Sequence, residues 1–192
     1  MPYRGNFFAK GSYYHVFNRG VNHQDIFYSQ ENYKYCLRLL KKYSGRYFIS
    51  IIAYCLMPNH YHFLIRQNTN IPISTFIKIL FNSYVQALNK QIGRSGPLFE
   101  GRYKHVLVDK HEYLVHLVRY IHLNPVEAGF VNNADDYQFS NYLEWIGVRT
   151  GTIIDRDFIR QYFPDLADYV RFVVDYQNEK EMMKKLEKYL FD

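Results

Sequence analysis

Two histidines on one short segment could bind a divalent metal ion. They are His60 and His62, separated by Tyr61, in the run MPNHYHFLI that begins at Met57. On a strand, residues two apart point to the same face and lie about 6.6–7 Å apart. The two imidazoles would therefore lie together, with Tyr61 on the other face. A pair of hydrogen-bonded surface histidines is the alternative interpretation, because the pattern is short.

A second polar group has the spacing of a helix. His116, Tyr120 and Asn124 are four residues apart, so a helix would place them in one stripe. The apolar face of the same helix would contain Leu114, Leu117, Val118 and Ile121. Two members of the stripe could also have purely structural roles. Asn124 precedes a proline and could be a helix-stop residue, and Tyr120 could be an aromatic side chain at a rim.

The elements that must position these residues follow from hydrophobic periodicity and turn signals. Ser29, Ser74 and the pair Asp109 and Glu112 are the predicted helix starts. The predicted order is strand, helix, strand, strand, helix, strand, helix, over residues 13–18, 30–43, 47–57, 60–67, 74–92, 98–108 and 109–123. The predicted breaks are residues 44–46 after the first helix, 93–97 after the second, and Asn124-Pro125 after the third.

This order predicts an α+β fold with a ferredoxin-like antiparallel sheet, the split βαβ arrangement, and helices on one face. The third helix would be added to that unit. We expect one domain over residues 1–145. Residues 146–192 would form a mainly helical C-terminal extension packed on the same domain, ending in a charged helix over about 166–190.

Composition favours a nucleic-acid partner. The chain has 192 residues, a net charge of +6 and 19% aromatic residues, of which 20 are tyrosines. The charge is uneven: residues 1–130 have 16 Lys and Arg against 6 Asp and Glu, and residues 131–192 have 8 against 12. Cations bind phosphates and aromatic faces stack on unpaired bases. A basic soluble protein with a tyrosine-rich core is the alternative.

Other classes are disfavoured by the same composition. No apolar run is long enough to cross a bilayer and the N-terminus has no signal-peptide core. The two cysteines, Cys36 and Cys55, lie in apolar stretches and are expected to be reduced core residues. We therefore expect a soluble cytoplasmic protein with no membrane partner.

Taken together, the motifs resemble a known superfamily. The segment HYH at His60 resembles the histidine–hydrophobic–histidine motif of HUH endonucleases. The run YIHLNPVEAG at Tyr120 resembles the nucleophile helix of their single-tyrosine transposases. Further similar segments are YHVFNRG at Tyr14, LMPNH at Leu56, GRYK at Gly101 and DYQFSNY at Asp136. Over about residues 10–145 the chain is most similar to the REP-associated tyrosine transposases, which resemble the IS200-like transposases.

The resemblance implies an enzyme and its site. Tyr120 would be the nucleophile that cleaves single-stranded DNA near hairpin-forming sites, through a 5′-phosphotyrosine intermediate. Mg²⁺ or Mn²⁺ would be held by His60, His62 and Asn124. Insertion-sequence members commonly have glutamine at the position of Asn124, whereas the REP-associated group has asparagine, as here. His116 and His122 are not expected to act directly, since one lies a turn from Tyr120 and the other points away from it.

Basic residues of the first 130 are candidates for holding the DNA backbone: Arg4, Lys10, Arg19, Arg66, Arg102, Lys104 and Arg119. The expected partner is single-stranded or hairpin DNA, bound by a monomer or a homodimer. Two other functions remain open. One is a catalytically inactive or domesticated DNA- or RNA-binding protein on the same scaffold. The other is a water-using metal phosphodiesterase, which is weaker because no carboxylate or third histidine accompanies the pair.

Overall fold

A four-stranded antiparallel sheet forms the centre of the protein. The structure, a computed structural model, describes residues 8–178. The strands are β1 (Tyr13–Arg19), β2 (Ile49–Leu56), β3 (His60–Gln67) and β4 (Lys104–Val108), in the spatial order β2-β3-β1-β4. Each neighbouring pair is antiparallel. This order confirms the predicted ferredoxin-like sheet.

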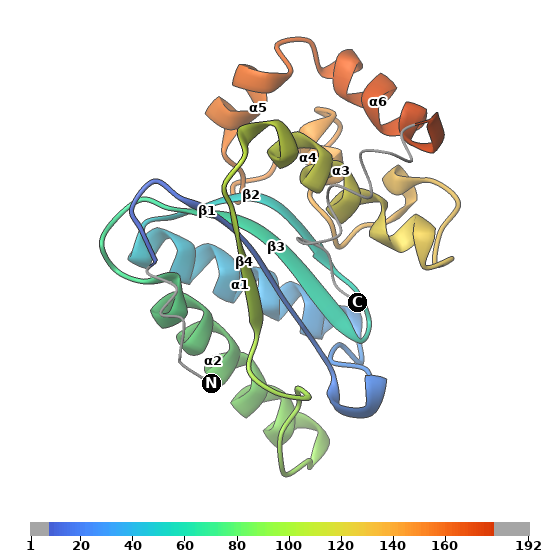
Figure 1. Ribbon diagram of the computed structural model, residues 1–192. Coiled ribbons are helices and arrows are strands. Elements are labelled where there is room, and N and C mark those ends of the chain that lie inside the picture. The colour runs from blue at the N-terminus through green and yellow to red at the C-terminus, as the bar shows by residue number, and fades with distance from the viewer. Residues whose placement is uncertain (1–7, 179–192) are drawn as a thin grey trace, which may run out of the picture.

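Helices cover both faces of this sheet. They are α1 (Gln30–Tyr47), α2 (Ile73–Ile92), α3 (His111–Glu127), α4 (Tyr142–Trp145), α5 (Arg156–Tyr162) and α6 (Leu166–Val174). Short 3-10 helices span Val21–His23, Ala134–Asp136 and Asp175–Asn178. In Figure 1, α1 and α2 run along one side of the sheet, while α3 gathers with α4, α5 and α6 at the top of the view.

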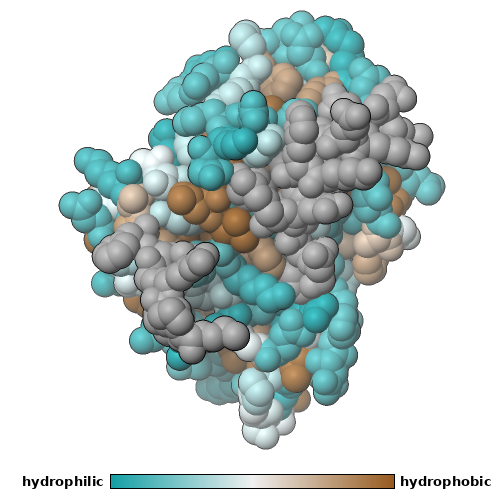
Figure 2. Space-filling view, in the orientation of Figure 1, coloured by the Kyte–Doolittle hydropathy of each residue, from teal (hydrophilic) through white to brown (hydrophobic). Residues whose placement is uncertain are grey.

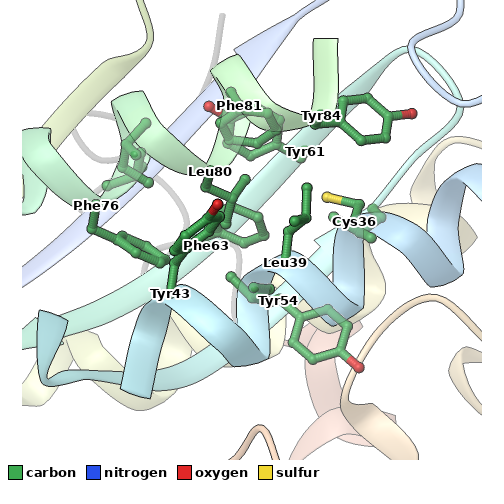
Figure 3. Close-up of a cluster of buried hydrophobic side chains, with 14 of the residues drawn as sticks. Cys36, Leu39, Tyr43, Tyr54, Tyr61, Phe63, Phe76, Leu80, Phe81 and Tyr84 are labelled. Carbon is green, nitrogen blue, oxygen red and sulfur yellow. The ribbon is translucent and has the colours of Figure 1, made fainter. Parts of the chain in front are cut away.

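Alternation along β3 separates two hydrophobic cores. Tyr61, Phe63 and Ile65 point toward α1 and α2, where they pack in a cluster rich in aromatic rings. Figure 3 shows this cluster between the sheet and the two helices. Leu64 points the other way, into a second cluster with α3 and the C-terminal helices. His60 and His62 share the face of Leu64, so the sheet presents both histidines to α3.

The first helix is longer than predicted. Residues 44–46 do not break α1, which continues to Tyr47 and ends where Phe48 adopts a left-handed conformation with φ 54°. Ser44 is buried and its hydroxyl donates to the carbonyl of Lys41, so it is satisfied within the helix. Gly45 costs about 1 kcal/mol in a helix, and packing of the apolar face of α1 outweighs that cost.

Two predicted helix starts are wrong by one residue or more. Helix α2 begins at Ile73, one residue before Ser74, with Pro72 at the N-cap position. The amide oxygen of buried Gln67 accepts from the Ile73 N–H, so a side chain from the end of β3 satisfies this helix end. Helix α3 begins at His111 with Lys110 at the N-cap position, not Asp109.

The third helix does not stop at Asn124. Helix α3 continues through Pro125 to Glu127. A proline has no N–H to donate and is expected to break or kink a helix interior, but Pro125 lies in the last turn, where little helix follows. The helix ends as the Phe130 N–H donates to the Pro125 carbonyl and Gly129 takes a positive φ of 72°. Asn124 is therefore a helix residue with its side chain held toward the sheet.

The last strand is shorter than predicted. Of the predicted range 98–108, only Lys104–Val108 pairs as β4, against β1. The preceding residues form a loop that touches the end of β1 through an isolated bridge between Phe99 and Gly20. Gly101 therefore lies in this loop.

The C-terminal extension packs on the second core. Phe158, Ile159, Tyr169 and Val173 are buried in the same cluster as Trp145 and the apolar face of α3. The predicted helix over 166–190 is described only in part. Helix α6 ends at Val174, the 3-10 helix follows to Asn178, and the rest of the range lies outside the described residues.

Truncation after Gly147 should strongly destabilise the protein. It removes the four buried side chains of α5 and α6 and exposes the Trp145 side of the second core. Lost burial of this size costs at least about 5 kcal/mol, which is comparable with the whole stability of many domains. Thermal unfolding followed by circular dichroism would measure the effect. An unchanged midpoint would contradict the packing of α5 and α6 on this core.

The two cysteines lie in the core, as the sequence predicts. Cys36 and Cys55 are free and fully buried. Within residues 8–178, no helix is long and apolar enough to span a membrane. Among the coloured residues in Figure 2, hydrophilic ones predominate, with a hydrophobic area near the centre of the view.

Candidate active site

The fold brings four sequence-predicted residues together at one end of the sheet. The ring of Tyr120 packs edge-on against His62, with ring centroids 5.7 Å apart. The Nε2 atom of His60 lies 2.9 Å from the Oδ1 atom of Asn124. Helix α3 therefore presents its tyrosine and its amide to the two histidines at the start of β3, as the resemblance implies. Tyr120 is half-buried, so it is partly open to solvent.

Strand register fixes the floor of this site. His60 pairs with Arg19 and His62 pairs with Phe17 across β1, and Lys104 of β4 pairs with Phe17 on its other side. Directly opposed residues of an antiparallel sheet point to the same face. Arg19 and Lys104 therefore lie on the face that contains both histidines.

The shorter of the two His60 contacts, to Asn59, favours a proton on Nδ1 of the ring. The amide nitrogen of Asn59 donates to the carbonyl of His23, which turns the Asn59 oxygen toward His60. That oxygen lies 2.6 Å from Nδ1 of His60 and so accepts its N–H. In a neutral imidazole the other nitrogen then has a lone pair. Nε2 of His60 and Oδ1 of Asn124 are thus two acceptors that face each other.

These two facing acceptors fit a divalent cation. Two ligands at right angles around Mg²⁺, each at 2.0–2.1 Å, lie about 3 Å apart, close to the 2.9 Å between Nε2 of His60 and Oδ1 of Asn124. Burial lowers the pKa of His60, an effect opposed by the Asn124 carbonyl and assisted by the charge of Arg19. Burial also places the pKa of His62 well below its usual range, and the neighbouring histidines add to this. Both rings are therefore neutral at pH 7, the form that binds metal.

Sequence reasoning missed two residues of the site. Asn59 orients His60 by accepting its Nδ1 proton. His15 of β1 lies beside His62, with its Nε2 atom 3.0 Å from Nδ1 of His62. The sequence predicts a strand over residues 13–18, but only the pairing of β1 with β3 shows which residues His15 meets. No local signal in the sequence could have found that contact.

Two histidines of α3 near Tyr120, His116 and His122, lie outside the site. Nδ1 of His116 accepts from Arg119, and its ring packs on Phe172 of α6. His122 is fully buried on the far side of the helix, where its nitrogens bond to the Tyr169 hydroxyl and to Oδ1 of Asn141. Neither ring faces the metal-binding atoms.

The burial of His122 predicts that the protein loses stability in acid. Burial lowers its pKa from 6.5 to about 3. Between these values the unfolded chain binds one proton more than the folded chain, so stability falls as pH decreases, by up to about 1.4 kcal/mol per pH unit. His122→Gln cannot titrate and should lack this component. Urea unfolding of the wild type and of His122→Gln at pH 7, 6 and 5 would test this prediction. The free energies of unfolding of the two proteins should converge toward pH 5. Parallel pH dependences would contradict the lowered pKa of His122.

The predicted DNA-binding residues separate into groups. Arg19 and Lys104 lie on the site face, and Arg102 is exposed on the loop whose Gly101 carbonyl accepts from Asn18, near the end of β1. Arg19 also forms an ion pair with Glu100 at 2.6 Å. These three cations therefore lie at the same end of the sheet as the candidate site.

The remaining cations do not lie at the site. Lys10 and Arg66 lie at the opposite end of the sheet, and Arg66 is about 20 Å along β3 from His60 and pairs with Asp155 at 3.4 Å. Arg119 is fully buried, and its Nη1 atom donates to the carbonyl of Phe172 while the guanidinium stacks on that ring. Its prediction as a DNA contact is wrong, because α6 covers it. Arg4 lies outside the described residues.

A ferredoxin-like sheet that presents two histidines to a tyrosine-bearing helix is the arrangement of a transposase of the HUH type. The chain belongs to the IS200-like transposase family, whose sequence profile matches residues 9–124. No curated protein sequence matches the chain.

One solved structure shares the fold of this chain. A REP-associated tyrosine transposase, solved bound to a REP hairpin, is similar with a TM-score of 0.65 and 17% identity. The similarity covers 81% of this chain and 98% of that one, and it shows a shared fold. A protein assigned as a transposase from Deinococcus radiodurans R1 has a TM-score of 0.44 and 19% identity, over 63% of this chain and 95% of that one. A TM-score below 0.5 does not establish a shared fold.

Proposed function

We propose that this transposase-family protein is a metal-dependent single-strand DNA endonuclease and transesterase that acts near hairpin-forming sites. The observation that carries the proposal is the pair of facing acceptors, Nε2 of His60 and Oδ1 of Asn124, beside the Tyr120 ring. A divalent cation bound by both atoms would satisfy the two lone pairs. A tyrosine beside such a cation is placed to attack a phosphate that the cation binds.

Tyr120 is the proposed nucleophile. Its phenolic oxygen would form a bond to phosphorus as the bond from phosphorus to the 3′ oxygen breaks. The phenolic proton would end on that 3′ oxygen, giving a free 3′ hydroxyl and a 5′-phosphotyrosine. The covalent intermediate keeps the energy of the phosphodiester for rejoining to another 3′ end.

His60, His62 and Asn124 would hold Mg²⁺ or Mn²⁺, which would polarise a phosphate oxygen and make phosphorus a better electrophile. Two imidazoles and one amide leave open positions for a substrate. Among residues 8–178, no three His, Cys, Asp or Glu side chains are grouped to hold a metal. The amide of Asn124 is therefore needed to complete the set.

DNA is the proposed partner, and its path would follow the cations around the site. Arg19, Arg102 and Lys104 lie near the histidine end of the sheet, where they can bind backbone phosphates on either side of the cleaved position. The similar REP-associated transposase was solved with a hairpin, which supports hairpin DNA as the substrate class for this chain.

Denaturing electrophoresis tests the proposal. The protein is incubated with hairpin DNA with single-stranded flanks and Mn²⁺, in two preparations labelled at the 5′ or the 3′ end. A bond to the 5′ phosphate predicts that only the 3′-end label travels with the protein. Adduct with the 5′-end label, or cleavage without any adduct, would contradict the proposed chemistry. The latter result would favour a water-using phosphodiesterase, and DNA binding without cleavage would favour an inactive binding protein.

A further inference from the structure

His15 and His62 share one hydrogen bond inside the protein. Nε2 of His15 lies 3.0 Å from Nδ1 of His62, and the two rings are inclined by only 17°. Both side chains are almost completely buried, with exposed fractions of 0% and 1%. Two neutral imidazoles can form this bond only if one nitrogen donates its proton and the other accepts it. The direction of the bond decides which nitrogen of His62 has the lone pair.

We propose that His15 is a positioning residue that accepts the Nδ1 proton of His62, so that His62 presents the Nε2 lone pair to the divalent cation. The inference rests on the proposed function, since it assigns a role toward the metal used there. With the opposite direction, the neutral His62 ring would have its proton on Nε2 and could not bind metal through that atom. Outer partners commonly fix metal-binding histidines in this way.

His60 supports this direction because it is held in the same way. Its Nδ1 donates to the Asn59 oxygen, which leaves Nε2 facing Asn124. If His62 donates from Nδ1 to His15, both histidines of the motif present Nε2. The two outer partners come from different parts of the fold, the turn before β3 and the neighbouring strand β1.

His15 is not placed as a third ligand. Its Nε2 atom is engaged with Nδ1 of His62, on the side of that ring away from Nε2. In the part of the chain that the structure describes, His15, His60 and His62 do not form a group able to hold one metal ion. The ring of Phe17 lies 4.7 Å from the His15 ring and 6.0 Å from the His62 ring, measured between centroids, and so packs against both.

Nitrogen NMR of the metal-free protein tests the tautomer directly. Long-range proton–nitrogen spectra distinguish a histidine protonated on Nδ1 from one protonated on Nε2. We expect His62 to have its proton on Nδ1 in the wild-type chain. A His62 ring protonated on Nε2 would overturn the inference. This readout needs no metal, no DNA and no variant, so it decides the question even where a variant fails to fold.

Two variants connect the tautomer to metal binding. His15→Phe keeps a ring but removes the acceptor, and should weaken Mn²⁺ affinity in calorimetry by about 10–100-fold. His15→Gln places an amide oxygen at about the position of Nε2, and should keep the affinity within about threefold of wild type. Thermal unfolding of both variants is the control for folding. If His15 had only a structural role, each variant would lose Mn²⁺ affinity in proportion to its loss of thermal stability.

The outcomes separate the inference from the proposed function. Equal Mn²⁺ affinity in wild type and folded His15→Phe would overturn the role of His15, while the proposed function would stand. A wild-type chain that binds no Mn²⁺ and forms no adduct would overturn the proposed function. In that case the role of His15 toward the metal would be overturned as well. The NMR spectra would still give the direction of the hydrogen bond between His15 and His62.

Discussion

Tyr120→Phe should abolish the covalent protein–DNA adduct while leaving DNA binding close to wild type. The phenyl ring keeps the edge-on packing against His62 and His15, and only the nucleophilic oxygen is lost. Removal of a nucleophile typically costs at least about 10³-fold in rate, so adduct should fall below detection. Denaturing electrophoresis with hairpin DNA and Mn²⁺ measures the adduct, and a filter or anisotropy assay measures binding.

Tyr113→Phe is the matched control for this variant. Tyr113 lies on the same helix, but it is buried in the second core near the N-terminus of α3. Its loss of a hydroxyl should leave the adduct at wild-type yield. If Tyr120→Phe still formed adduct and Tyr113→Phe did not, the nucleophile would have been assigned to the wrong tyrosine.

His60→Ala should remove both metal binding and cleavage without unfolding the chain. A lost ligand should weaken Mn²⁺ binding by more than about 100-fold, since even outer partners cost 10–100-fold. His60 is the better choice for this variant because it is half-buried, so its truncation leaves a smaller cavity than truncation of the buried His62. Loss of His62 would also remove the hydrogen-bond partner of His15. Calorimetry with Mn²⁺ measures affinity, and electrophoresis measures cleavage.

His111→Ala is the corresponding control. His111 is an exposed histidine at the start of α3, where Nδ1 lies 3.2 Å from the Tyr162 hydroxyl. The His111→Ala variant should bind Mn²⁺ and cleave DNA as the wild type does. Unchanged Mn²⁺ affinity in His60→Ala would return His60 and His62 to the interpretation of a hydrogen-bonded pair without metal.

Local patterns predicted the sheet because each strand had its own signal. Alternation over 60–67 placed His60 and His62 on one face, and helical spacing placed Tyr120 and Asn124 in one stripe. The boundaries failed where side-chain packing and capping decided them. Packing of α1 carries the helix across Gly45, and the buried side chain of Gln67 satisfies the first turn of α2. Neither effect follows from hydrophobic periodicity or from turn residues, which set the predicted boundaries.

The candidate site was predictable in its motif residues and not in their partners. His15 and Asn59 are ordinary strand and turn residues until β1 pairs with β3 and the turn folds against His23. Arg119 shows the opposite error. A cation beside the proposed nucleophile suggested a phosphate contact, but the chain returns through α6 and covers it with Phe172. Charge alone does not reveal burial.

Mass spectrometry of the trapped adduct tests the central claim most directly. The wild-type chain is incubated with hairpin DNA and Mn²⁺, digested with nuclease and protease, and the modified peptide is sequenced. We expect a nucleotide joined through its 5′ phosphate to Tyr120 alone, and no modified peptide when the metal is chelated. A nucleotide on any other residue, or an adduct that forms equally well without metal, would contradict the assignment of Tyr120 and of its metal site.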